Sequence, residues 1–121
     1  MPLRCLIVDD SDHFKEAARL LLEADGLAVV GTASGSAEAL RRLEESRPDV
    51  VLVDIDLGVE SGFDLARLVV RVTDPPHVIL ISAYEESDFA EMIAASPAAA
   101  FLPKPALSGR AIAEIVAGGA R

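Results

Sequence analysis

The chain has 121 residues, 51% of them hydrophobic, which suits one domain with a sizeable core. Its formal net charge of −9 argues against direct contact with nucleic acid, because phosphate backbones attract clustered lysine and arginine. Its apolar runs are too short to cross a membrane or to form a signal peptide, and its single cysteine allows no internal disulfide. These features predict a single cytoplasmic domain over residues 1–121 that makes no membrane contact.

Short runs rich in valine, isoleucine and leucine predict strands, and they mostly lack two-residue alternation, as is typical of strands covered on both faces. Between them, apolar residues three or four positions apart predict helices. Ser36 and Ser108 are expected to cap two of these helices, and Leu107 with Ile112 to form a hydrophobic staple. In chain order we expect a strand at 3–8, a helix around 14–22, a strand at 27–33, a helix from 36, a strand at 50–53, a helix around 63–69, a strand at 77–81, a helix around 89–93, a strand at 98–102 and a helix from about 108.

This fivefold alternation predicts an α/β domain, a parallel sheet with helices on both faces. Polar residues follow four of its five strands. The first run ends in Asp9 and Asp10, the third in Asp54 and the fourth in Ser82, while Lys104 closely follows the fifth. Each alone has an ordinary structural reading as a turn, cap or surface residue. Because ligands bind at the carboxyl ends of such strands, the joint placement favours a shared site.

The residue types at this edge fit phosphoryl chemistry. Carboxylates gathered in one cleft repel one another, and Mg²⁺, which prefers oxygen ligands, removes that penalty. The lysine and the serine hydroxyl then neutralise and position a phosphoryl group, and an aspartate can accept it. Asp54 is the best placed acceptor because it ends the central strand, whereas Asp56, two residues later, is a second acid of the same cleft.

With these residues assembled, the sequence resembles the receiver domain of two-component response regulators over nearly its whole length. The segments that carry the resemblance are "LIVDDS", "VLVDIDLGVESG", with Gly62 eight residues after Asp54, "LISA" and "AFLPKP". The resemblance implies a flavodoxin-like sheet in the order 2-1-3-4-5 within a (βα)5 three-layer sandwich. It also implies a phosphoprotein that signals by conformational change and catalyses only its own phosphorylation and dephosphorylation.

The family pattern implies roles for individual residues. Asp54 takes the phosphoryl group from a histidine kinase or phosphotransfer protein. Asp9, Asp10, Asp54 and the carbonyl of Asp56 hold Mg²⁺ or Mn²⁺. Ser82, Ala83 and Lys104 bind the phosphoryl group, Ser82 and Phe101 form the switch, and the Lys104–Pro105 bond is cis. We further expect Asp56 and Tyr84 to tune the lifetime of the aspartyl phosphate, and homodimerisation on phosphorylation stays open.

Gly58 departs from the family pattern, because a proline commonly stands four residues after the acceptor, so we expect a more mobile loop. Two other readings remain. The "DIDLG" segment resembles the D-x-D motif of haloacid-dehalogenase-type phosphatases, although that family places this motif on its first strand. A pseudo-receiver that binds proteins without phosphorylation is the other. Likeness to regulators that carry a helix-turn-helix domain suggests an output domain elsewhere in a longer chain.

Overall fold

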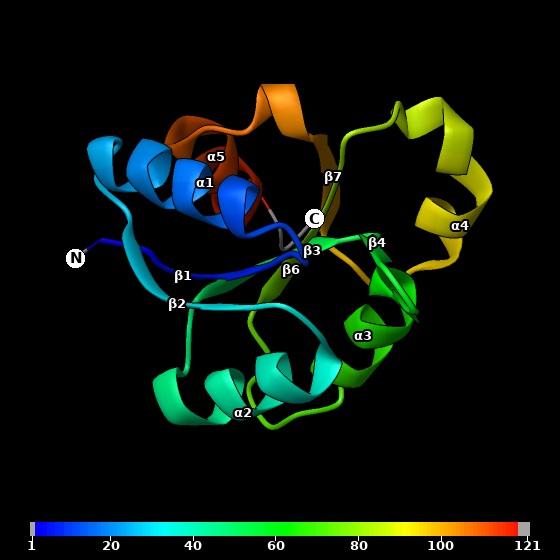
Figure 1. Ribbon diagram of the computed structural model, residues 1–121, viewed down its shortest axis with the longest axis horizontal. Coiled ribbons are helices and arrows are strands. Elements are labelled where there is room, and N and C mark those ends of the chain that lie inside the picture. Colours follow the sequence, from blue (N-terminus) through cyan, green and yellow to red (C-terminus); the bar gives the residue numbers. More distant parts are fainter. Residues whose placement is uncertain (1, 119–121) are drawn as a thin grey trace.

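The computed structural model describes residues 2–118, which form a sheet of five parallel strands between two layers of helices. The strand order is β2-β1-β3-β6-β7, which is the predicted order 2-1-3-4-5 when the main strands alone are counted (Figure 1). In chain order the elements are β1 (Arg4–Val8), α1 (Asp12–Ala24), β2 (Ala28–Ala33), α2 (Ser36–Ser46), β3 (Val50–Asp54), β4 (Asp56–Leu57), β5 (Glu60–Ser61), α3 (Gly62–Val69), β6 (His77–Ser82), the 3₁₀ helix η1 (Glu86–Phe89), α4 (Ala90–Ala95), β7 (Ala100–Pro103), the 3₁₀ helix η2 (Lys104–Ala106) and α5 (Gly109–Gly118).

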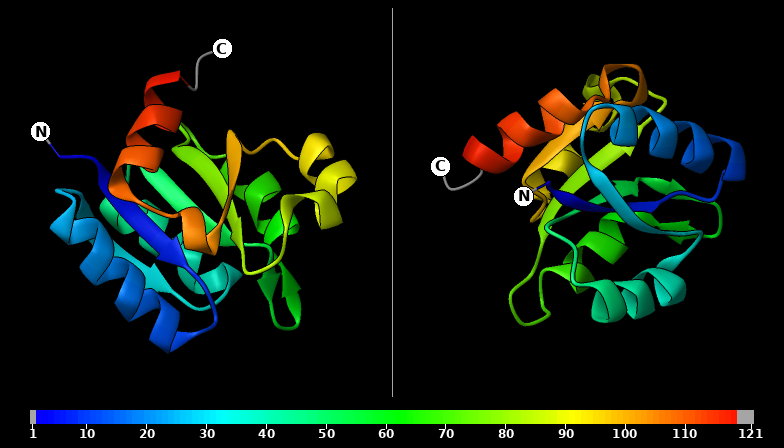
Figure 2. Two further views of the ribbon diagram at one scale, coloured as in Figure 1. Left: turned by 90° about the horizontal axis from the view of Figure 1, so that it is seen from above. Right: turned by 90° about the vertical axis from the view of Figure 1, so that its left-hand side faces the viewer.

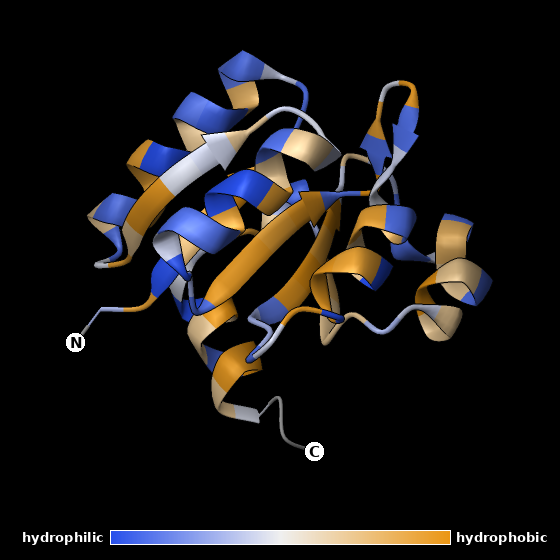
Figure 3. Ribbon diagram, turned by 90° about the horizontal axis from the view of Figure 1, so that it is seen from below, coloured by the Kyte–Doolittle hydropathy of each residue, from blue (hydrophilic) through white to orange (hydrophobic). Residues whose placement is uncertain are grey.

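Two hydrophobic clusters, one on each face of the sheet, hold the layers together. One cluster joins the sheet to α2 and α3, with Phe89 and Ile93 at its margin, and the other joins it to α1 and α5. Figure 2 shows the helices on the two faces of the sheet from two further sides. Figure 3 shows that the strands are apolar and that the helices around them have one polar face. Burial of both sheet faces explains why β3 and β6 read as unbroken apolar runs. The predicted α/β three-layer sandwich is confirmed.

Strand register fixes the functional edge. Val8 pairs with Val53, and Asp54 pairs with Ile81, so Asp9, Asp54 and Ser82 follow neighbouring strands at nearly the same level. None of the described helices is long and apolar enough to cross a membrane.

Of the two predicted helix caps, the one at Ser108 is found and the one at Ser36 is not. The Ser108 hydroxyl accepts from the amide of Ala111, and Leu107 and Ile112 are both buried, as expected. Ser36, however, is the first residue of α2, and the cap position is Gly35, which makes no side-chain bond. Instead, Glu60 Oε1 accepts a hydrogen bond from the Ser36 amide at 2.8 Å. A carboxylate from β5 therefore pairs with a free amide in the first turn of α2.

The segment after Asp54 forms a hairpin that the apolar pattern did not predict. Strands β4 and β5 pair antiparallel, with Leu57 opposite Glu60, and Gly58 and Val59 form the turn (Figure 2). Gly58 has φ +77°, a conformation that proline, fixed near −65°, cannot adopt. Gly58 is therefore compatible with a turn that a proline at this position would not allow.

The fourth helical segment is weaker than its spacing predicted. It is divided into η1 and a six-residue α4, and neither contains a buried residue. Met92 is half exposed rather than turned into the core. Pro97 follows closely and prevents continuation of the helix, and the alanine-rich sequence offers little apolar surface to anchor it.

Candidate phosphoryl-transfer site

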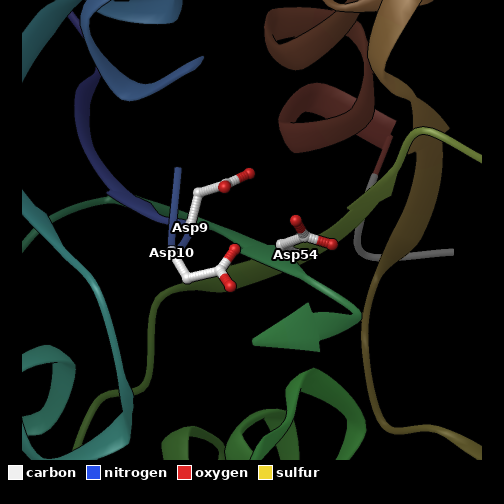
Figure 4. Close-up of side chains that lie close together, drawn as sticks. All are labelled: Asp9, Asp10 and Asp54. Carbon is white, nitrogen blue, oxygen red and sulfur yellow. The ribbon is translucent and has the colours of Figure 1, made fainter. Parts of the chain in front are cut away.

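Three carboxylates meet where β1 and β3 end. Oxygens of Asp9, Asp10 and Asp54 all lie within 4.8 Å of one another, and Figure 4 shows these side chains around a shared space. Asp9 is fully buried, Asp54 is 6% exposed and Asp10 is exposed. Such a group of oxygens suits a hard divalent cation, because bringing three carboxylates together without one is electrostatically costly.

The lysine that follows β7 reaches this group from the other side of β3. Lys104 Nζ lies 2.7 Å from Asp9 Oδ2 and donates a hydrogen bond to Asp54 Oδ2 at 3.1 Å. The contact with Asp9 is an ion pair without hydrogen-bond alignment, so Asp9 Oδ2 remains a buried oxygen with no hydrogen-bond donor among the described residues. The Lys104 ammonium group therefore contacts two carboxylates, and Asp9 Oδ2 can still accept a further partner at the centre of the site.

The same local turn orients the polar side chain at three strand ends. Asp9 Oδ1 accepts the amide of Ser11, Asp54 Oδ1 accepts the amide of Asp56, and Ser82 Oγ accepts the amide of Tyr84. In each case the donor is two residues further along the chain. Aspartate and serine favour this turn, which fixes the side chain at the sheet edge.

Electrostatics at the site can be read from two pKa shifts. Burial raises the pKa of Asp54 from its ordinary 3.8 to about 6, and Asp9 adds to the rise, while the Asp56 amide and Lys104 oppose it. Burial alone would lower the pKa of Lys104, but Asp9 and Asp54 outweigh it, and the net shift is upward. Without a metal ion, the site therefore disfavours the ionised form of Asp54 and favours the protonated, charged form of Lys104.

These shifts predict a pH dependence of stability. A carboxyl whose pKa is higher in the folded than in the unfolded state binds more protons when folded, so metal-free stability should fall as pH rises from about 4 to about 6. A shift of this size corresponds to about 3 kcal/mol, and solvent screening at the open edge of the sheet reduces the expected loss to about 2 kcal/mol, levelling off above that range. Urea unfolding in EDTA across this range measures it. Asp54→Asn should flatten the curve; an identical slope in that variant would contradict the assignment.

Several predicted site residues lie apart from the central cluster. Asp56 is exposed, its carboxylate accepts the amide of Gly58 at 3.1 Å, and its own amide donates to Asp54 Oδ1. Ala83 is exposed beside buried Ser82. Tyr84 is 59% exposed and its ring lies 6.1 Å from that of Phe89.

One expectation is corrected, and another stays a prediction. The Lys104–Pro105 bond is trans, as are all peptide bonds of the described chain. The chain passes from β7 straight into η2, where the Leu107 amide donates to the Lys104 carbonyl, and this turn accommodates the trans bond that X–Pro sequences ordinarily prefer. Phe101 is 9% exposed and packs in the core on the α3 side, and its role as a switch residue stays a prediction.

Two contacts made by side chains of α1 had no clear signal in the sequence. Phe14, which reads as part of the apolar face of α1, places its ring 4.1 Å from Lys104 Nζ. Lys15 is buried, with its Nζ 2.5 Å from Ser34 Oγ and 3.1 Å from Asp12 Oδ1. The contact of Phe14 with Lys104 and that of Lys15 with Ser34 depend on how α1 lies against the sheet, which no local spacing reveals.

Comparison with known proteins decides the family. The model of the response regulator receiver domain matches residues 5–116. The chain belongs to the response regulator receiver family. This receiver domain is 33% identical over 115 residues to Response regulator GacA of Pseudomonas viridiflava, a match that covers 94% of the chain and 52% of GacA.

Other relatives place the same domain in different contexts. A protein-glutamate methylesterase/protein-glutamine glutaminase of Hahella chejuensis is 34% identical over 83% of the chain but only 29% of that enzyme. Among solved structures, a two-component response regulator of the LuxR family from Aurantimonas sp. SI85-9A1 has a TM-score of 0.85 at 29% identity, covering 98% of this chain and 87% of that one. The chain thus spans about half or less of the length of these curated relatives. A receiver domain of two-component signal transduction was the predicted function class, and the dehalogenase-type alternative does not hold.

Proposed function

We propose that this receiver domain accepts a phosphoryl group on Asp54 from a phosphohistidine of a sensor histidine kinase or phosphotransfer protein. The observation that carries the proposal is the bridge from Lys104 Nζ to Asp54 and Asp9 inside a cluster of three carboxylates. In the transfer, the bond from phosphorus to the donor nitrogen breaks as a bond to an Asp54 oxygen forms. Such a reaction needs alignment and charge stabilisation more than acid–base chemistry.

Accessibility and contacts favour Asp54 over its two neighbours as the acceptor. Asp9 is fully buried, so a donor on another protein has no approach to it. Asp10 is exposed, but no contact with Lys104 orients it. Asp54 combines a small exposed fraction with an oriented carboxylate, held at Oδ1 by the Asp56 amide and at Oδ2 by Lys104.

The donor set fits Mg²⁺ or Mn²⁺, ions that accept carboxylate and carbonyl oxygens. Asp9, Asp10 and Asp54 would hold it through their side chains and Asp56 through its carbonyl. The bound ion supplies positive charge that offsets the carboxylates and the incoming phosphoryl oxygens. The buried Asp9 Oδ2, which lies 2.7 Å from Lys104 Nζ but has no aligned hydrogen-bond donor, can accept such an ion as a further partner.

We infer that Ser82, Ala83 and Lys104 bind the transferred phosphoryl group and that Ser82 starts the conformational response. The Ser82 hydroxyl already accepts the Tyr84 amide, and the Tyr84 ring contacts Phe89 at the start of α4. Movement of Ser82 toward a phosphoryl oxygen therefore reaches the α4 surface through this turn. Phe101, which is buried in the cluster that Phe89 and Ile93 border, is proposed as the second switch residue.

Asp56 and Tyr84 are proposed to set the lifetime of the aspartyl phosphate, because each lies two residues beyond a phosphoryl-site residue and is exposed to incoming water. Substituting both, Asp56→Ala with Tyr84→Ala, should change the rate of dephosphorylation severalfold without preventing modification. The decay of phosphorylated protein after removal of the donor measures this. Equal decay rates would reject the idea.

We further propose that residues 1–121 act as one phosphoacceptor unit in the cytoplasm, catalysing only their own phosphorylation and dephosphorylation. The partner is a kinase or phosphotransfer protein, and homodimerisation on phosphorylation is the second interaction to test. The negative charge of the chain favours an output that does not involve direct DNA contact by this domain.

Incubation with acetyl phosphate and Mg²⁺, followed by intact-mass analysis, tests the proposal. The unchanged protein should gain one phosphoryl group, and EDTA should prevent the gain. Asp54→Asn should gain none, whereas Asp56→Asn, which changes a nearby acid by the same single atom, should still be modified. Modification of the Asp54→Asn protein, or none in the unchanged protein, would overturn the proposed function and favour a pseudo-receiver.

A further inference from the structure

The ammonium group of Lys104 has a third neighbour besides its two carboxylates. Its Nζ lies 4.1 Å from the centroid of the Phe14 ring. Phe14 stands in the first turn of α1, and its amide donates to the hydroxyl of Ser11, which caps that helix. The ring is therefore attached to a backbone position that the cap fixes.

The surroundings of the ammonium group give this contact weight. Asp9 and Asp54 approach it at 2.7 and 3.1 Å, and the Lys104 side chain is only 19% exposed. An ammonium group beside the face of an aromatic ring is attracted by the ring quadrupole, and the attraction is stronger where water is excluded. The lysine stem is long and flexible, so an additional restraint on its end narrows the positions that the charge can take.

We propose that Phe14 is a positioning residue for phosphoryl transfer, which holds the Lys104 ammonium group over the Asp54 carboxylate. The inference rests on the proposed function, since Lys104 must move from the carboxylates to a phosphoryl oxygen during the reaction. An aromatic face suits this task. It attracts the charge without competing for a directed hydrogen bond, so the ammonium group can turn toward the phosphoryl group while it stays over the ring.

Phe14 also has a structural role, because it packs at the margin of the cluster that joins α1 and α5 to the sheet. Two variants separate the roles. Phe14→Leu keeps an apolar side chain of similar reach but removes the aromatic face, whereas Phe14→Tyr keeps the face. Urea unfolding of both variants establishes that they are folded under the assay conditions.

The rate of modification by acetyl phosphate at saturating Mg²⁺ is the functional measurement. Phe14→Leu should be roughly two- to fivefold slower than the unchanged protein, the size expected for one cation–π contact. Phe14→Tyr should restore the rate. The Mg²⁺ concentration for half-maximal rate should be the same in all three proteins, because Phe14 provides no ligand. Equal rates in the leucine variant and the unchanged protein, or equal slowing in both variants, would overturn the inference.

A second measurement tests the contact without any phosphorylation. In the unchanged protein, NMR signals of the Lys104 side-chain methylene next to Nζ should be shifted upfield by the ring current of Phe14. The shift should persist in Phe14→Tyr and vanish in Phe14→Leu. Absence of the shift in the unchanged protein would reject the contact. If the NMR shift is present but no protein becomes phosphorylated, the proposed function is wrong and the contact of Phe14 with Lys104 stands. If the unchanged protein is phosphorylated and all three rates agree, only the positioning role of Phe14 is wrong.

Discussion

Lys104→Met is expected to slow modification of Asp54 by acetyl phosphate by about a hundred- to a thousandfold, the usual cost of removing one preorganised donor from developing charge. Methionine keeps the length and apolar character of the lysine stem but removes the ammonium group that bridges Asp54 and Asp9. Mg²⁺ should still bind, because all three carboxylates remain. The measurement is the initial rate of phosphoprotein formation at saturating Mg²⁺.

Lys15→Met is the matched control. Lys15 is a buried lysine near the start of α1, and its ammonium group contacts Ser34 and Asp12 instead of the carboxylate cluster. Its removal should leave the rate close to that of the unchanged protein. If both variants were slowed equally, the special role given to Lys104 would have to be abandoned.

Gly62→Ala is expected to destabilise the domain by about 3 kcal/mol or more. A Cβ atom at this position would lie 2.0 Å from the carbonyl oxygen of Asp54 and 2.7 Å from the Cα atom of Ile55. Both are backbone atoms of the segment that carries the acceptor, and the Gly62 amide donates to the Ile55 carbonyl there. Relief of the clash must therefore displace either α3 or the Asp54 backbone, so phosphorylation should slow as well.

Gly31→Ala provides the comparison for this prediction. Its added methyl group would meet only the Leu6 and Arg42 side chains, at 3.4 and 3.8 Å, which is ordinary contact. Urea unfolding should show Gly31→Ala near the unchanged protein and Gly62→Ala far below it. Similar free energies of unfolding for the two variants would show that α3 can retreat from β3 without cost, contrary to the packing described.

Sequence patterns predicted the parts of this domain that depend on continuous apolar surface. The run before Asp54 is apolar because β3 is covered on both faces, and the pairing of β1 with β3 then brings Asp9 beside Asp54. Short or irregular parts escaped prediction. The β4–β5 hairpin has only two residues in each strand, too few for a recognisable alternation.

Tertiary contacts account for the remaining differences. The amide of Ser36 at the start of α2 donates to Glu60 from a different element, so the cap expected at Ser36 from its residue type is not formed. The inward position of Phe101 and the contact of Phe14 with Lys104 depend on how helices lie on the sheet. Local propensity carries no information about such distant partners.

The acyl phosphate proposed on Asp54 at the edge of the sheet can be trapped chemically. Borohydride reduces an aspartyl phosphate to homoserine, which peptide mass analysis locates in the sequence. After treatment with acetyl phosphate and Mg²⁺, we expect homoserine at position 54 alone, and none when EDTA is present. Homoserine at position 9, 10 or 56, or a phosphoryl group that resists borohydride on another residue type, would contradict this account.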